Sequence, residues 1–255
     1  MGVFDLFSKD SRTERAREKN ASRAINKFAQ SDVRFKALQA LRDDGSPEAL
    51  YALMRRFGMM YDKSIEDEQE KDWVFEVLVE KGGKVLEPLK KYLQTADSIS
   101  WPLRLLDKVV ATKEEQIDVI EEILARHEPG YERDPTKKIQ LLNHLGGLKH
   151  ARIPALVIPY FADMDEGVRY TAVEALLRLG EEAPAREPLL AHFGSDREES
   201  LRIRLRIAEG FAEQGWILGT HRGEVEKRLP DAFVIEPRET KGRPDDGNAR
   251  IKKKT

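Results

Sequence analysis

The feature that most constrains the fold is a short pattern that occurs twice. Residues 33–41 read VRFKALQAL and residues 168–176 read VRYTAVEAL. Their apolar positions recur every three or four residues, which predicts one buried face of an α-helix. A glycine and then a proline follow each copy (Gly45 and Pro47, Gly180 and Pro184). Because this order indicates a tight turn into a second helix, the chain is predicted to be a stack of helical hairpins.

Composition excludes several classes of function. The 255 residues carry a net charge of −2, so no overall attraction to nucleic acid is expected. The chain has no cysteine, which excludes disulfides and thiolate metal sites. Its histidines are scattered, without the helical i, i+4 spacing of a metal pair, and no G-x-S-x-G motif occurs. We therefore expect no metal, no cofactor and no enzymatic activity.

The chain also has no sequence typical of a membrane-spanning protein. Its apolar runs stay well below the ~20 residues that a helix needs to cross a bilayer, which predicts a cytoplasmic protein. Residues 1–10 form a short apolar segment through Val3, Phe4, Leu6 and Phe7. Such a segment either folds over the first helix or makes a weak contact with a membrane surface.

Residues 11–229 are expected to form the helical stack. Residues 11–30 predict a helix with a solvated first half and a packed second half, the latter through Ala21, Ala24, Ile25, Phe28 and Ala29. The acidic run 62–72 is expected to be an enlarged connection between helices. Residues 201–207 alternate as in a strand, but the spacing of Leu201, Leu205, Ala208 and Ala212 favours a helix. The C-terminal residues 230–255 predict either a β-hairpin, made by 232–236 and 249–253, or a basic tail.

The two copies and the proline-started second helices resemble the HEAT-repeat family. The resemblance implies an all-α fold, a right-handed α-solenoid of about six HEAT-like helix pairs. It also implies a non-catalytic scaffold that binds a protein partner along the concave face formed by the second helices. A HEAT-like nucleic-acid-binding protein or DNA glycosylase is the alternative. That alternative needs an aromatic residue beside a carboxylate, and the candidates are Trp101 with Asp107 and Tyr160 with Asp163.

Basic residues suggest how the stack is held together and what it binds. Arg34 and Arg169 occupy equivalent positions in the two copies and are expected to form ion pairs with acidic residues of the adjacent turn. Other cations lie near the ends of second helices: Arg55, Arg56, Lys90, Lys91, His192, Lys227 and Arg228. Stacked on one face, they would form a basic stripe that attracts an acidic or extended partner segment. The simpler interpretation is that such cations offset the helix dipole, by ~0.3–1 kcal/mol each.

Overall fold

The computed structural model describes the backbone of residues 3–240 and 243–254, and the side chains of residues 11–236 and 248–254. It is mostly helical, with a small antiparallel two-stranded sheet near the C-terminus. The chain divides into two compact units, Met1–Ile123 and Leu124–Thr255, called here the first and second unit. None of the helices in the described part of the chain combines the length and the apolar character needed to cross a membrane.

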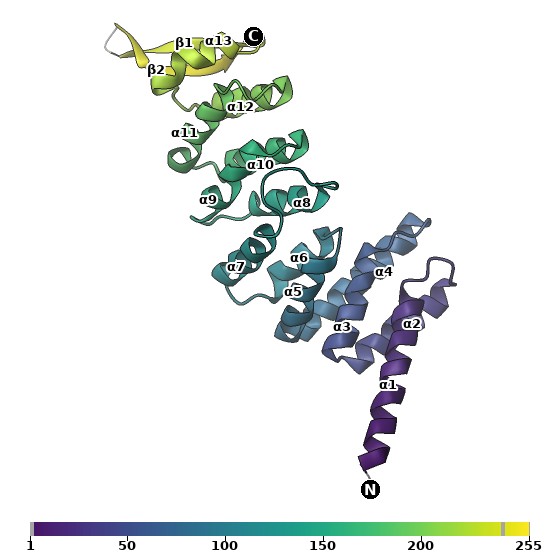
Figure 1. Cartoon of the computed structure of the whole chain (residues 1–255). Helices are drawn as coiled ribbons and strands as arrows, with labels where there is room; N and C mark the ends of the chain where they lie inside the picture. The colour runs from purple at the N-terminus through teal and green to yellow at the C-terminus, as the bar shows by residue number, and fades with distance from the viewer. Residues whose placement is uncertain (1–2, 241–242, 255) are drawn as a thin grey trace. The chain divides into compact units, whose positions relative to one another are not determined.

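The first unit is a series of helices that pack in succession (Figure 1). Its elements are α1 (Val3–Ala24), α2 (Ser31–Asp44), α3 (Pro47–Met54), η1 (Arg55–Gly58), α4 (Ser64–Lys81), η2 (Gly82–Val85), α5 (Leu86–Thr95), α6 (Ser100–Val109) and α7 (Lys113–Leu124). The helix α2 packs against α1 and α3, and α3 also packs against α5. Consecutive helical hairpins therefore share one apolar core.

The predicted turn between α2 and α3 is confirmed in its chemistry. Gly45 follows α2 with φ of 61°, a left-handed conformation that glycine adopts without steric cost. Ser46 then caps α3, because its hydroxyl accepts a hydrogen bond from the N–H of Ala49. Pro47 is the first residue of α3, where its missing N–H costs nothing.

The second unit continues with helical hairpins and ends in the sheet (Figure 1). Its elements are α8 (Thr136–Leu145), α9 (Ile153–Val157), η3 (Ile158–Ala162), α10 (Glu166–Leu179), α11 (Glu182–Phe193), α12 (Leu201–Gln214), η4 (Gly219–His221), α13 (Arg222–Arg228), β1 (Phe233–Thr240) and β2 (Arg243–Lys253). The helix α10, which holds the second copy of the pattern, packs against α8 and α12. Its predicted N-cap is confirmed, since Asp165 accepts a hydrogen bond from the N–H of Val168 at 3.0 Å.

The C-terminal segment forms the hairpin that the sequence allowed. β1 and β2 pair antiparallel, with Ile235 opposite Ile251. β2 also packs against α12, and an isolated bridge joins Ile217 to Arg250. The buried side chains of Phe233 and Ile251 give the hairpin an apolar contribution to the core of the second unit.

Two local expectations were wrong. The acidic run 62–72 is mostly helical, since α4 begins at Ser64 and its early acids, Glu66 and Asp67, lie in the favourable first turn. The packing predicted for the second half of residues 11–30 holds for the buried Ala21 and Ala24, but α1 ends at Ala24 and Phe28 in the following turn is 87% exposed. The solvated character of residues 11–20 is confirmed by their mostly exposed side chains. The side chains of Val3, Phe4, Leu6 and Phe7, which the sequence analysis considered for a membrane contact, are not among those that the structure describes.

Candidate functional site

The arginine of the first copy joins two helices of the first unit. Arg34 lies near the start of α2 and is fully buried. Its Nε and Nη2 atoms donate hydrogen bonds to the carboxylate of Glu70 in α4, at 3.2 and 2.8 Å. Its Nη1 atom donates to the carbonyl of Ala29, in the loop before α2, at 2.6 Å. This side chain therefore fixes both the loop and the neighbouring helix.

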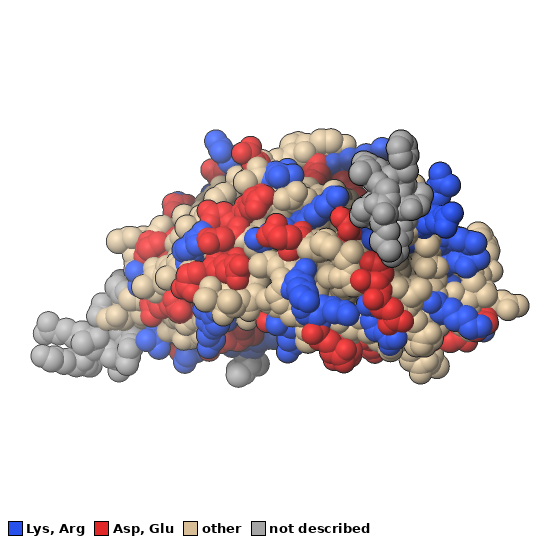
Figure 2. All heavy atoms as spheres, turned by 90° about the horizontal axis from the view of Figure 1, so that it is seen from below, with Lys and Arg blue, Asp and Glu red and all other residues tan. Residues whose placement is uncertain are grey.

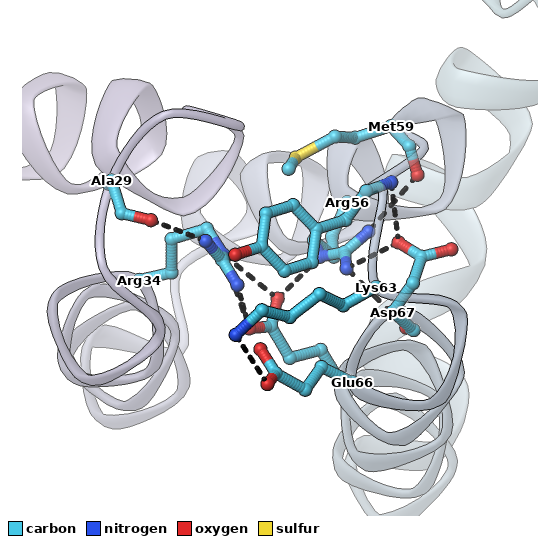
Figure 3. Close-up of polar contacts among 9 residues, drawn as sticks. Ala29, Arg34, Arg56, Met59, Lys63, Glu66 and Asp67 are labelled. Atoms are coloured by element: carbon cyan, nitrogen blue, oxygen red, sulfur yellow. Dashed lines mark hydrogen bonds and ion pairs between the residues drawn. The ribbon is translucent and has the colours of Figure 1, made fainter.

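A second arginine binds the same carboxylate. Arg56, from η1, donates through Nε to Oε2 of Glu70 at 2.8 Å and through Nη2 to Oδ1 of Asp67 at 2.7 Å. Figure 3 shows Arg34 and Arg56 approaching from separate elements, with Asp67 beside Arg56. We call Arg34, Arg56 and Glu70 the first carboxylate clamp. Since both arginines are fully buried, their charges depend on these partners.

The second unit has a similar arrangement around Arg169, which occupies the position equivalent to Arg34 in the second copy of the pattern. Arg169 of α10 donates through Nε and Nη2 to Glu198, at 2.8 and 3.2 Å. Its Nη1 atom donates to the carbonyls of Asp163 and Met164 in the preceding loop. His192, near the end of α11, places Nε2 3.0 Å from Oε2 of Glu198, outside hydrogen-bond geometry. We call Arg169, His192 and Glu198 the second carboxylate clamp. The ion pairs predicted for Arg34 and Arg169 are thus confirmed, and Glu198 lies in a connection as predicted, but Glu70 lies within α4 rather than in a turn.

The second basic residue is an arginine in the first clamp and a histidine in the second clamp. Arg56 is always charged, whereas His192 can lose its proton. Burial lowers the pKa of His192, and this effect outweighs the opposite effect of Glu198. Burial alone would raise the pKa of Glu198, but hydrogen bonds from Arg169 and the N–H of Ser200 outweigh it and lower the pKa. The second clamp therefore holds an ionised carboxylate beside a histidine that favours its neutral form.

This difference predicts a pH-dependent stability. Because the folded pKa of His192 lies below the ordinary value of about 6.5, the unfolded chain binds more protons at mildly acidic pH, and stability falls as the pH drops. The His192→Asn variant lacks this titration, while the other histidines are common to both proteins. We expect the stability advantage of the wild type over the variant to shrink between about pH 7.5 and about pH 5, measured by thermal unfolding. An advantage that stays constant with pH would contradict the prediction.

A surface suited to binding lies on the second helices of the first unit. Two hollows, of 430 and 310 Å³, share the side chain of Tyr51. The larger is also lined by Arg55, Tyr92 and Thr95, and the smaller by Pro47, Pro88 and Lys91. We call the surface formed by Pro47, Tyr51, Arg55, Pro88, Lys91 and Tyr92 the Tyr51 surface.

The tyrosines of this surface are held in place by several contacts. The rings of Tyr51 and Tyr92 meet edge to face, with centroids 5.7 Å apart. The hydroxyl groups of Tyr51 and Thr95 are hydrogen-bonded at 3.1 Å, and the Nζ atom of Lys91 lies 5.2 Å from the Tyr51 ring centroid. Burial raises the pKa of Tyr92 to about 12, so this phenol stays protonated at neutral pH. The surface is therefore ordered before any partner arrives, which lowers the entropic cost of binding.

The residues of the predicted basic stripe lie in different environments. In the first unit, Arg55 is exposed and has no ionic partner among the described residues, while Lys91 lies over Tyr51. Lys90 forms an ion pair with Glu87 at 3.0 Å. Arg56 contributes no surface charge, because it is fully buried in the first clamp.

In the second unit, the predicted basic residues are largely engaged in local contacts. The side chain of His192 is only 10% exposed, and Lys227 and Arg228 both pair with Glu224. Acidic and basic side chains are interspersed over the described residues of the face drawn in Figure 2.

The two aromatic–carboxylate pairs considered for a nucleic-acid enzyme, Trp101 with Asp107 and Tyr160 with Asp163, make contacts within the protein. Trp101 stacks on Phe57, with ring centroids 5.6 Å apart, and Asp107 accepts a hydrogen bond from Gln116. Tyr160 is buried and donates its hydroxyl hydrogen to the carbonyl of His127 at 2.9 Å.

The carboxylate considered beside Tyr160 is also engaged. Asp163 is 3% exposed and accepts a hydrogen bond from Lys138 at 2.8 Å. Both carboxylates of the candidate pairs thus have partners within the protein.

Tyr51 and Tyr92 were not identified from the sequence, although a signal is present. Each follows a proline by four residues, in Pro47–Tyr51 and Pro88–Tyr92, so both lie one helical turn after a proline. Glu70 and Glu198 carry no such signal, because they lie in acid-rich stretches. Comparison of the sequence with protein-family models and with curated proteins finds no match.

Proposed function

We propose that this chain is a non-catalytic protein–protein interaction scaffold, built as a right-handed HEAT-type solenoid of about six helix pairs. Its second helices would bind an acidic, extended segment of a protein partner. The two carboxylate clamps support the repeat architecture, because the arginines at equivalent positions of the two copies each bind a later glutamate and a carbonyl of the preceding loop. The Tyr51 surface is the single observation that carries the binding role.

The chemistry of the Tyr51 surface fits such a segment. Its two hollows are bounded by aromatic rings and prolines, which receive apolar side chains. The guanidinium of Arg55, which has no ionic partner among the described residues, and the ammonium of Lys91 flank the same tyrosine. The hollows are also lined by Asp97, Glu48 and Glu87, of which Glu48 lies 3.6 Å from Arg17 and Glu87 pairs with Lys90 at 3.0 Å. Carboxylates of the partner would therefore find a cation, Arg55 or Lys91, at either hollow. Buried aromatic side chains often contribute more than ~2 kcal/mol to binding, whereas exposed ion pairs contribute ~0.2–1 kcal/mol. Tyr51 is therefore expected to dominate affinity, and the cations to select an acidic segment.

The test uses labelled peptides and fluorescence anisotropy. The probe is an extended peptide in which glutamate alternates with leucine and proline, and its counterpart carries lysine in place of glutamate. We expect the wild type to bind the acidic peptide in preference to the basic one. Tyr51→Ala should weaken that binding by about tenfold or more, the equivalent of ~1.4 kcal/mol.

A charge-matched pair of variants tests the role of the cations. Arg55→Glu with Lys91→Glu should abolish the preference for the acidic peptide. Lys19→Glu with Lys108→Glu makes the same change in net charge at exposed positions outside the Tyr51 surface, and should preserve it. If both double variants lost the preference for the acidic peptide equally, the net charge of the protein, and not Arg55 and Lys91, would cause that preference. If the wild type bound duplex DNA more tightly than the acidic peptide, and only the variant with Arg55→Glu and Lys91→Glu lost this binding, the proposal would be replaced by a nucleic-acid role.

A further inference from the structure

The two hollows of the Tyr51 surface follow one another along α3 and α5, which pack together. The smaller hollow is lined by Pro47 and Pro88, each in the first turn of its helix. The larger hollow is lined by Arg55, directly after α3, and by Thr95, the last residue of α5. Tyr51 lies between these ends and lines both hollows. A partner segment that fills both hollows therefore runs along the two helices rather than across them.

The separation of the hollows matches the repeat of one extended backbone conformation. Arg55 follows Pro47 by eight residues, and Thr95 follows Pro88 by seven. At the rise of an α-helix these separations are roughly 10–12 Å, and the hollow centres lie somewhat closer because both hollows include Tyr51. A polyproline II helix repeats its side-chain directions every three residues, which is about 9 Å. Side chains on one face of a β-strand recur every ~7 Å, which is too short for the two hollows.

The hydrogen-bond donors of the surface distinguish this conformation from an α-helix, whose two-turn repeat of ~11 Å is similar. Arg55 and Lys91 are exposed, and their N–H groups can donate to carbonyls as well as to carboxylates. A polyproline II backbone leaves its carbonyls without internal hydrogen bonds, whereas an α-helix uses most of its own internally. The partly buried ring of Tyr51, between the hollows, provides an aromatic wall of the kind on which prolines pack. The surface therefore favours a polyproline II segment over a helical one.

We propose that the segment bound by the Tyr51 surface is an acidic, proline-rich chain in the polyproline II conformation. One proline occupies the smaller hollow, and another proline three positions away occupies the larger hollow. Glutamates beside the prolines pair with Arg55 and Lys91. A chain that is stiff before binding loses little conformational entropy, which favours affinity. The partner class specified in this way rests on the proposed function, because it concerns the same surface.

The experiment measures fluorescence anisotropy of labelled peptides that have the same composition, glutamate, glycine and two prolines, and differ only in the spacing of the prolines. We expect prolines three positions apart to bind about tenfold more tightly than prolines two or four positions apart, because only that spacing fills both hollows together. Equal affinities would overturn the polyproline II assignment and leave the scaffold role standing. Tighter binding of a helix-forming acidic peptide with leucines seven positions apart would also overturn it. No binding of any acidic peptide would contradict both this assignment and the proposed function.

A matched pair of variants tests whether the second hollow causes the preference for this spacing. Ala96 lines the larger hollow, so Ala96→Leu places a bulkier side chain there and should remove the tenfold preference. Ala111 is exposed and lines neither hollow, so Ala111→Leu makes the same chemical change and should preserve the preference. Circular dichroism establishes that both variants fold. A preference that survives in Ala96→Leu, or that both variants lose equally, would overturn the placement of two prolines in the two hollows.

Discussion

Replacement of Glu70 by alanine is expected to lower the free energy of unfolding by about 3–5 kcal/mol, the range measured when one partner of a buried ion pair is removed. The loss is large because one carboxylate serves both Arg34 and Arg56, each fully buried. The measurement is urea unfolding followed by tryptophan fluorescence. Two of the three tryptophans, Trp73 and Trp101, lie in the first unit, so the signal reports mainly on that unit.

A neighbouring glutamate provides the control for this variant. Glu68 lies on the same helix, α4, but is exposed and has no ionic partner among the described residues. Glu68→Ala should change stability by no more than about 0.5 kcal/mol. Similar losses in the two variants would mean that the first clamp contributes no more than a surface charge, and would contradict the structural role assigned to it.

The clamps show what could be predicted from the sequence. Local spacing placed Arg34 and Arg169 at the same point of two amphipathic helices, and a buried arginine requires a carboxylate. The identity of that carboxylate could not be predicted. Glu70 follows Arg34 by 36 residues and lies among other acids, and only the packing of α4 against α2 selects it. An ion pair between residues so far apart in the sequence depends on the tertiary packing, which local sequence patterns do not contain.

The errors have a related origin. Acidic residues dominate the run 62–72, so local composition indicated a connection although the residues form the first turns of α4. Arg56 was predicted as a surface cation, but the chain tightens into η1 at this point and Arg56 finds Glu70 and Asp67 inside the unit. In both cases a charged residue was interpreted as solvated, because partners distant in sequence were not visible.

The ambiguous stretch 201–207 shows the converse, a helix that local evidence could predict. Ser200 caps α12 by accepting a hydrogen bond from the N–H of Ile203, and Ile203 and Ile207 are fully buried one turn apart. Leu201, the first residue of α12, is 61% exposed. Leu201 belongs to both the strand alternation and the predicted helical spacing, and the buried face of α12 is formed instead by Ile203, Ile207, Ala208 and Phe211. The helix is therefore confirmed, but its core face differs from the one predicted by Leu201, Leu205, Ala208 and Ala212.

Replacement of Gly146 by alanine is the second substitution expected to have a large effect. Gly146 ends α8 with ordinary helical φ and ψ, so alanine is conformationally acceptable there. Its Cβ would, however, lie 2.7 Å from the Cα of Ala175 and 3.0 Å from that residue's Cβ. The obstacle is largely backbone and cannot rotate away, so α8 and α10 must separate. We expect a loss of about 1–3 kcal/mol, measured by urea unfolding with circular dichroism.

The control for this variant is a glycine with the opposite expectation. Gly223 lies in α13 and is exposed, and a Cβ added there would meet no atom within 4 Å. Gly223→Ala should therefore raise stability by about 0.4–1 kcal/mol, since it restricts the unfolded chain without strain. The two substitutions make the same chemical change, so opposite signs would assign the loss at Gly146 to contact with α10. A gain at both positions would mean that α8 and α10 tolerate a wider spacing, and that their close approach does not fix how neighbouring hairpins pack.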